Sequence, residues 1–227
     1  MSTTFGALKT AVAAALKDPS NQTFSASAIG DMVNEAISEV SRIEPMQFQE
    51  DITPVADTLE YIVLSDMFSA EAQPEIEIAR VELWDGGETP NKRLYVVEPA
   101  SAGLVADSQT GWLIWGGTLY LPRYVWSSFN GHEDTYLIRV WGYCPYQQCT
   151  TDDEVVNMTA EPMFAVQTYA RLIGLERLLS ERELFSQWQT RSGNTDISPA
   201  ALMNALGIAR DEWRRRSRAL SRLRSAV

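Results

Sequence analysis

The sequence predicts an α+β protein: a helical bundle core with an inserted antiparallel β-sandwich or small β-barrel and a C-terminal helical arm. Two changes in apolar spacing predict this class. Apolar residues recur at helical spacing before residue 50 and after residue 152, and mostly at strand spacing between residues 51 and 151. A third observation is the length of 227 residues, 45% of them hydrophobic, which allows a buried core without disulfide or metal support.

Two helices are expected before residue 50. The first spans residues 5 to 17. The second begins at "FSASAIG", where the hydroxyl of Ser25 or Ser27 can accept a backbone N–H left free at a helix start, and it ends before Pro45. The second helix has an apolar face (Ile29, Met32, Val33, Ala36, Ile37, Val40 and Ile43) and an acidic back (Asp31, Glu35 and Glu39).

The insertion contains short segments rich in aromatic and β-branched residues, which are typical of strands. Gly116-Gly117 suits a two-residue hairpin turn, because glycine permits positive φ at both positions. The large apolar residues beside this turn do not alternate with polar ones, so we expect both faces of the sheet to be covered. The strand segments are "LEYIVL", "EIEIARVELW", "KRLYVV", "WLIW", "TLYLP" and "YLIRVWGY".

Helical spacing returns with Pro162, which suits the first turn of a helix that continues to about Thr190. "RSGNTD" follows as a flexible linker, and Ser198 and Pro199 begin the last helix as its N-cap and first residue. The predicted organisation is a helical core (1–50 and 152–192), a β insertion (51–151), and a linker with a C-terminal docking helix (193–227).

Residue types that carry chemistry in enzymes form no constellation in this sequence. The one histidine, His132, lies beside a turn without an evident catalytic or metal-binding neighbour. Asp152 and Asp153 precede a helix, whose N-terminus favours negative charge, so they need no cation to explain them. Nucleotide-binding and hydrolase motifs are absent from the sequence. We therefore expect a protein that is not an enzyme, with no catalytic residue, metal or cofactor.

Cysteine usage and hydropathy indicate the compartment. Cys144 and Cys149 have no metal-binding spacing and are expected to be free thiols in a reducing environment. Because no apolar run reaches the roughly 18 residues of a membrane span, we expect a soluble protein made in the cytosol, with no membrane partner.

One group of aromatic residues in the β insertion could stack on bases or sugars, although their strand spacing favours a place in the core or in an interface. The group consists of Trp112, Trp115, Tyr120, Tyr124 and Trp126.

Charge is divided unevenly along the chain. The last 18 residues, 210–227, hold seven arginines against two acidic residues, a net of +5, in a protein of net charge −11. The preceding 209 residues hold 12 basic and 28 acidic side chains, a net of −16. An acidic body repels nucleic acid, whereas the terminal segment can attract a polyanion or an acidic protein surface.

Helical spacing separates two features of residues 202–224. One is a narrow apolar seam, which consists of Leu202, Leu206, Ala209, Trp213, Leu220 and Leu223. The other is a set of arginines: Arg216 and Arg224 lie within or beside the seam, and Arg210, Arg214, Arg215, Arg218 and Arg222 cover the other sides. A helix with one narrow apolar seam docks along a groove or against another helix.

Three interpretations of this helix stay open. It packs on its own body with its arginines in water, it binds DNA as an arm, or it inserts into a partner protein. We favour insertion, because arginine on the seam is costly to bury without an anionic partner, and because the polar linker allows the helix to leave the body. The predicted docking residues are Leu202, Leu206, Trp213, Arg214, Arg215, Arg216, Arg218, Leu220, Arg222, Leu223 and Arg224.

The whole layout resembles the head-to-tail connector (adaptor) proteins of tailed bacteriophages. "FGALKTAVAAALKDPSNQTFSASAIGDMVNEAISEVSRIEP" looks like that family's opening pair of helices. "LEYIVLSDMF" and "ARVELWDG" are similar to two of its strands, although Val63-Leu64-Ser65-Asp66 lacks the family's usual proline. "YLIRVWGYCPYQQCTTDDEVVNMTAEPMFAVQTYARLIGLERLL" resembles its last strand, threonine–aspartate loop and returning helix.

The resemblance implies a structural virion protein. Its copies form a homo-oligomeric ring, commonly a dodecamer, in the neck between head and tail. The C-terminal segment docks onto the portal protein, and the lower surface receives a downstream tail or nozzle protein. Genomic DNA passes through the lumen without specific binding, and assembly takes place in the host cytoplasm. The alternatives are a nucleic-acid-binding protein with an arginine-rich C-terminal arm, or a stopper or tail-completion protein.

Overall fold

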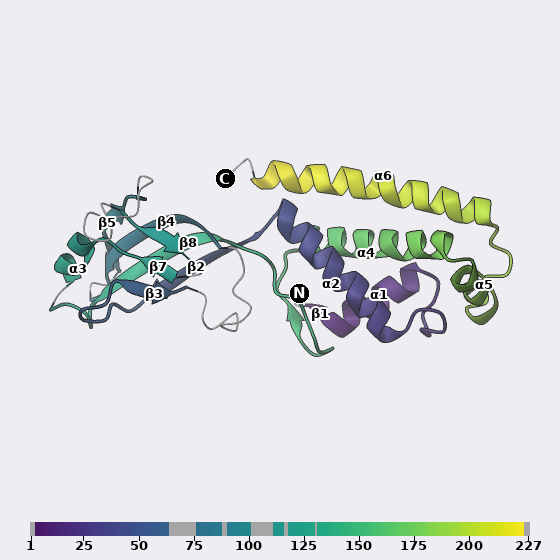
Figure 1. The fold of residues 1–227 in the computed structure, drawn as a ribbon, viewed down its shortest axis with the longest axis horizontal. Helices are drawn as coiled ribbons and strands as arrows, with labels where there is room; N and C mark the ends of the chain where they lie inside the picture. Colours follow the sequence, from purple (N-terminus) through teal and green to yellow (C-terminus); the bar gives the residue numbers. More distant parts are fainter. Residues whose placement is uncertain are drawn as a thin grey trace. The chain divides into compact units, whose positions relative to one another are not determined.

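The computed structural model describes residues 3–63, 76–87, 90–100, 111–115, 118–129 and 131–224. Its contacts divide the chain into a helical unit, Met1–Pro45 with Tyr146–Val227, and a β unit, Met46–Pro145 (Figure 1). The predicted α+β class is confirmed. The β unit begins and ends a few residues before the predicted boundaries of 51 and 151, and the last helix is part of the helical unit.

The helical unit contains α1 (Phe5–Ala15), α2 (Ala26–Ile43), α4 (Ala160–Ser180), α5 (Arg182–Arg191) and α6 (Pro199–Arg224). A short pair of strands, β1 (Thr3–Thr4) and β9 (Val155–Val156), runs antiparallel beside them. Ser25 caps α2, since its Oγ accepts the N–H of Ala28 at 3.1 Å. The apolar face predicted for α2 is buried from Ile29 to Val40, and Ile43 packs against the same core.

Helix α4 is the centre of this unit, because it lies along both α2 and α6 (Figure 1). It buries residues on several sides, as a central helix must. At Gly174 a Cβ atom would come within 2.6 Å of the Leu16 side chain, so any larger residue there would require this buried leucine at the end of α1 to move.

The prediction of one helix from Pro162 to about Thr190 is wrong at Glu181. There the backbone is extended (φ −114°, ψ 102°), and the helix divides into α4 and α5. The break allows α5 to place Trp188 in the core, where the side chain is 2% exposed. Its Nε1 donates to the backbone oxygen of Leu16 at 2.9 Å.

The β unit contains two antiparallel sheets. The larger has the order β2 (Met46–Ile52), β8 (Tyr136–Cys144), β4 (Glu77–Asp85), β5 (Lys92–Val97). The smaller has the order β3 (Glu60–Ile62), β7 (Thr118–Tyr120), β6 (Leu113–Trp115). Both sheets contribute to one apolar core, so of the two predicted forms the described strands make the sandwich and no closed barrel.

Pairing in the small sheet agrees with the predicted hairpin. Trp115 faces Thr118 across β6 and β7, which leaves two residues for the turn; Gly116 and Gly117 themselves lie outside the described residues. The sequence did not predict α3 (Arg123–Phe129), a short helix that places Val125 in the core of the sandwich.

Candidate functional site

The start of α6 has the predicted form. Pro199 is its first residue, and the Ser198 Oγ accepts the N–H of Ala201 at 3.2 Å. Pro199 has no N–H to leave unsatisfied there, and its fixed φ suits the first helical turn. Helix α6 then continues to Arg224.

The segment before α6 is held in place, and the expectation of a flexible linker is wrong. Asn194 is 8% exposed, and its Nδ2 donates to the backbone oxygen of Lys17 at 3.0 Å. The Nε2 of Gln189 donates to the oxygen of Ile197 at 2.8 Å. The turn needs the left-handed backbone of Gly193 (φ 69°), which glycine adopts without strain.

A buried carboxylate ties this turn to the loop between α1 and α2. Asp18 is fully buried, and its oxygens accept the N–H groups of Gln22, Thr23 and Phe24 at 2.8–2.9 Å. The Ser192 hydroxyl donates to Asp18 at 2.8 Å. Four charge-assisted hydrogen bonds therefore fix the position from which α6 begins.

The apolar seam of α6 packs within its own subunit. Its described members Leu202, Leu206, Ala209 and Leu220 are at most 8% exposed, in the same core as α2 and α4. Trp213 is half-buried against Tyr169 of α4. The seam is thus not free to enter a partner protein in this structure. The interpretation favoured from the sequence, insertion of the seam into a partner, is replaced by packing of α6 on its own subunit.

Arg216 finds its anionic partners inside the chain. Its guanidinium lies 3.1 Å from the carboxylate of Glu212, on the same helix, and 3.8 Å from that of Glu161 at the start of α4. It also lies over the ring of Phe164, 5.6 Å from the centroid. Contrary to the expectation from the sequence, Arg216 therefore does not require a second protein, since Glu161 of α4 and Glu212 of α6 supply the counter-charge.

The remaining arginines differ in how they are engaged. Arg210 pairs with Glu176 of α4 at 2.9 Å, and Arg214 approaches Asp211 at 3.4 Å. Arg215 makes one weak contact with a backbone oxygen, and within the described part of the chain no carboxylate pairs with Arg218. Three further predicted docking residues, Arg222, Leu223 and Arg224, belong to α6, but their side chains lie outside the described part.

Helix geometry groups Arg214, Arg215 and Arg218, which make no ion pair with another helix in the described part of the chain, with two further apolar residues of α6. Met203 and Ile208 are 64% and 62% exposed. At 3.6 residues per turn Ile208 lies on the side away from the seam, with Arg214, Arg215, Arg218 and the exposed Asp211, and Met203 lies at the edge of that side. We call Met203, Ile208, Arg214, Arg215 and Arg218 the outer α6 face. The signal was present in the sequence, as large apolar residues out of phase with the seam.

The two units differ in net charge. The range of the β unit contains 15 acidic and five basic side chains, a formal net of −10. The helical unit contains 15 acidic and 14 basic side chains, a net of −1. The acidity of the protein therefore belongs mainly to the β unit, and the outer α6 face is a cationic surface on a nearly neutral helical unit.

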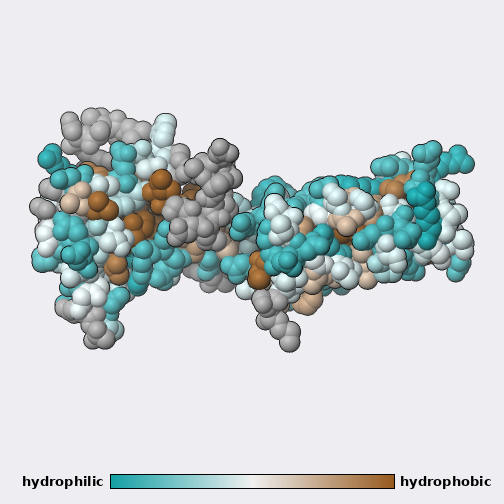
Figure 2. All heavy atoms as spheres, turned by 90° about the horizontal axis from the view of Figure 1, so that it is seen from below, coloured by the Kyte–Doolittle hydropathy of each residue, from teal (hydrophilic) through white to brown (hydrophobic). Residues whose placement is uncertain are grey.

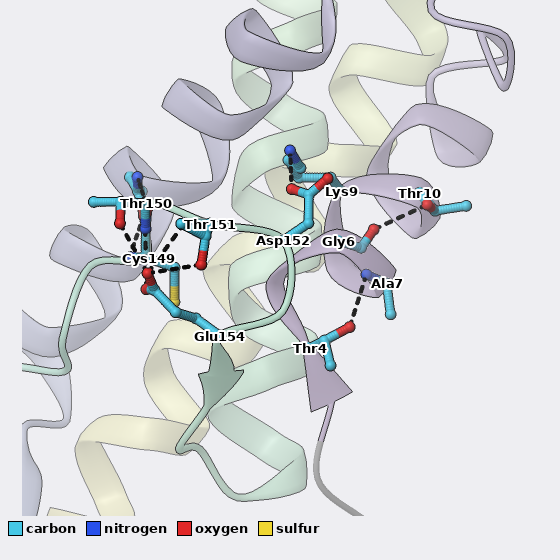
Figure 3. Close-up of polar contacts among 11 residues, drawn as sticks. Thr4, Gly6, Ala7, Lys9, Thr10, Cys149, Thr150, Thr151, Asp152 and Glu154 are labelled. Carbon is cyan, nitrogen blue, oxygen red and sulfur yellow. Dashed lines mark hydrogen bonds and ion pairs between the residues drawn. The ribbon is translucent and has the colours of Figure 1, made fainter.

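The threonine–aspartate loop at residues 150–154 is a structural clamp (Figure 3). The carboxylate of Glu154 accepts hydrogen bonds from the hydroxyl and backbone N–H groups of Thr150 and Thr151, which lower its pKa to about 2. The backbone oxygen of Asp152 accepts the N–H of Gly6 at 3.0 Å, and its side chain pairs with Lys9. The loop thus anchors the first turn of α1.

His132 and the two cysteines were the other residues considered for catalysis or metal binding. His132 is exposed and stacks on Tyr136, with ring centroids 5.0 Å apart. Cys144 and Cys149 are free and buried, and burial raises the pKa of each thiol to about 11. In the described ranges no three potential metal ligands come together, and no helix there has the length and hydropathy to cross a bilayer.

The aromatic group of the β unit divides between core and surface. Trp112 packs against the core of the sandwich, whereas Trp115 is 64% exposed and Tyr124 is 45% exposed. Tyr120 is partly buried, and the side chain of Trp126 lies outside the described residues. The described rings of this group do not form one stacking platform, since Trp112 belongs to the inside of the unit and Trp115 and Tyr124 to the outside.

Comparison with protein-family models and with curated proteins finds no match for this chain.

Proposed function

We propose that this chain is a structural head-to-tail connector (adaptor) protein of a tailed bacteriophage, whose copies form a ring in the virion neck that joins the portal to the tail. The layout of the chain supports this proposal, since an α+β fold with a mainly β insertion between helical segments has the organisation expected from the resemblance. Portal protein, a downstream tail or nozzle protein and further copies of the chain are the partners.

The observation that carries the proposal is the outer α6 face. Helix α6 is fixed at its start and buried along its seam, so Met203, Ile208 and the outward arginines form a rigid surface. Exposed arginine next to large apolar residues is the composition of protein interfaces, and a guanidinium binds a partner carboxylate through two parallel hydrogen bonds. We propose that this face, and not the seam, docks onto an acidic surface of the portal.

The charge of the β unit supports the second part of the role. A net of −10 repels the phosphate backbone, so DNA would pass a ring of these units without binding to it. A surface of that sign also disfavours the alternative of a DNA-binding protein, which would rely on the outer α6 face alone.

The proposal is tested by charge reversal on the surface, because deletion of α6 would uncover its apolar contacts on α4. We expect the R215E/R218E double variant to fold normally and to lose co-sedimentation with portal rings of the same phage. The matched control is R182E/R191E, which reverses two exposed arginines on α5. Undiminished portal binding by R215E/R218E would refute the docking role of the outer α6 face.

The wild-type protein and the R215E/R218E variant also distinguish the connector proposal from the alternative of a nucleic-acid-binding protein. If wild-type protein shifts duplex DNA in a gel at low salt, and the shift disappears in R215E/R218E, the arginines bind phosphate and the connector proposal fails. We expect no shift. Electron micrographs of the purified protein with portal provide the remaining test, since a ring with a central hole is required.

A further inference from the structure

The outer face of the large sheet is organised around one buried carboxylate. Glu82 of β4 is 2% exposed. One oxygen contacts the guanidinium groups of Arg80 and Arg93, and the other accepts the indole N–H groups of Trp84 and Trp141 at 2.7 and 3.2 Å. Burial alone would raise the pKa of Glu82, but these donors outweigh it and lower the pKa. The carboxylate thus fixes two arginines and two tryptophans as a rigid array.

Neighbouring strands extend this array. Asp51 of β2 pairs with Arg139 of β8 at 2.6 Å, and Arg139 lies 4.2 Å from the ring centroid of Trp84. Val96 of β5 lies opposite Glu82 and is 39% exposed, and Trp141 is 37% exposed. Glu77 lies at the end of the same face, across from Tyr143.

The parts of this array that reach solvent have the composition of an interface. The side chains of Arg80 and Arg93 are 42% and 50% exposed, and each contact with Glu82 uses only part of a guanidinium that carries five N–H donors. We call Arg80, Arg93, Val96 and Trp141 the arginine–tryptophan face. These side chains are already held in place, so they lose little conformational entropy when a partner binds.

The outer face of the small sheet has the opposite character. Ile62, Thr118 and Trp115 form one row across β3, β7 and β6, and Ile62 and Trp115 are 55% and 64% exposed. Glu60 is exposed on the same side of β3, and it is the one charged residue of these three described strands. We call Glu60, Ile62 and Trp115 the glutamate–tryptophan face.

These two faces belong to opposite sides of one sandwich. The inner residues of the small sheet, Tyr61 and Leu119, share a core with Val81, Leu83 and Val140 of the large sheet. Because the inner faces meet, the outer faces point away from each other, and one copy cannot bring its own two faces together. Figure 2 shows apolar side chains on the surface of the β unit among hydrophilic ones.

We propose that the arginine–tryptophan face of one copy binds the glutamate–tryptophan face of the next. The Glu60 carboxylate then meets free N–H groups of Arg80 and Arg93, while Trp115 and Ile62 are buried against Trp141 and Val96. Complementary charge identifies a second copy as the occupant, since one face carries the exposed arginines Arg80 and Arg93, and the described residues of β3, β6 and β7 include the carboxylate of Glu60 and no cation. A contact between two different faces repeats from copy to copy, and it gives a ring when the rotation between successive copies closes.

The inference rests on the ring of the proposed function and gives it a subunit contact. Two variants block one face each. V96E places a carboxylate on the arginine–tryptophan face, opposite Glu82, and E60R removes the partner charge and adds a cation. We expect wild-type protein to assemble in sedimentation velocity with a strong dependence on salt, and each variant alone to be monomeric. An equal mixture must form a 1:1 heterodimer that does not grow, because it retains one intact contact.

Matched controls carry the same charge changes on the helical unit. V155E and D153R alter exposed positions there, and both must assemble like wild type. Circular dichroism and urea unfolding establish that each variant is folded. If V96E or E60R fails to fold, V96Q or I62K replaces it.

Three outcomes would overturn the inference: a monomeric wild type at every concentration, assembly by either blocked variant, or a mixture that stays monomeric. Its failure can be told from failure of the proposed function, since portal docking depends on Arg215 and Arg218. Portal binding by a wild-type protein that does not self-assemble rejects only the contact inferred here. Assembly without portal binding rejects only the docking role of the outer α6 face.

Discussion

Trp213 of α6 packs on Tyr169 of α4, with ring centroids 4.6 Å apart and ring planes tilted by 44°. The contact lies in the middle of the seam between Ala209 and Leu220, both of which are buried. Tilted aromatic pairs at this distance add to the free energy of apolar burial. The C-terminal helix is therefore part of the folded core of the helical unit.

We expect W213A to lower the free energy of unfolding by about 2 kcal/mol, since the ring is half-buried and a fully buried aromatic costs more. Urea denaturation followed by far-UV circular dichroism measures the change. I208A is the control, because that side chain is 62% exposed and its loss should change stability by less than about 0.5 kcal/mol. Equal stability of W213A and wild type would mean that α6 does not pack on α4 in solution.

A second prediction concerns the buried carboxylate of Asp18. D18A leaves three backbone N–H groups of the loop without an acceptor, two of them at 2.8–2.9 Å from the same oxygen. Unsatisfied buried donors are costly, so we expect a loss of about 3 kcal/mol. D18N, which keeps one acceptor oxygen, should lose less, and D31A at an exposed position on α2 should lose little.

The order of loss D18A, D18N, D31A is the diagnostic result, measured by urea unfolding of the three proteins. If D18N is as unstable as D18A, the negative charge matters more than the hydrogen bonds to the loop. If D18A unfolds like wild type, Asp18 does not fix the start of α6.

The sequence was sufficient for the features that local chemistry decides. Ser25 and Ser198 cap helices because of their own hydroxyls, and the change from helical to strand spacing marks the two units. The break at Glu181 was not predictable in this way. It accompanies the distant contact between Trp188 and Leu16, which a pattern along the chain does not contain.

For a related reason, only part of the candidate site on α6 could be predicted from the sequence. Periodicity separates the seam of α6 from its arginines, but it does not say what covers the seam. The answer depends on α4, whose Tyr169 and Glu161 receive Trp213 and Arg216. The cluster around Glu82 could not be predicted from the sequence either. Its four hydrogen-bond donors come from β4, β5 and β8, and only the pairing register of these strands brings them together.

The third prediction concerns the two buried thiols. Burial raises the pKa of Cys144 and Cys149 to about 11, so at pH 8 nearly all of each thiol is protonated and poorly nucleophilic. We expect Ellman's reagent to modify the native protein slowly and to detect two thiols at once in urea. C144S and C149S assign each reaction. Rapid modification of one thiol in the native state would show that its part of the core opens readily.

The last prediction is the pH dependence of the loop that anchors α1. The hydrogen bonds from Thr150 and Thr151 lower the pKa of Glu154 from 4.5 to about 2 in the folded protein. A carboxyl group with a depressed folded-state pKa stabilises the protein above its unfolded pKa, and this contribution is lost as the pH falls from about 4.5 to about 2. E154Q should therefore be less stable than wild type at pH 6. The difference in Tm should shrink as the pH falls through that window, because protonation of Glu154 removes from wild type the stabilising charge that E154Q lacks at every pH.

The control is D153N, which removes a neighbouring exposed carboxylate that makes no described contact with these threonines. It should keep the wild-type pH profile. A constant difference between E154Q and wild type from pH 6 to pH 2 would mean that the carboxylate charge of Glu154 does not hold this loop.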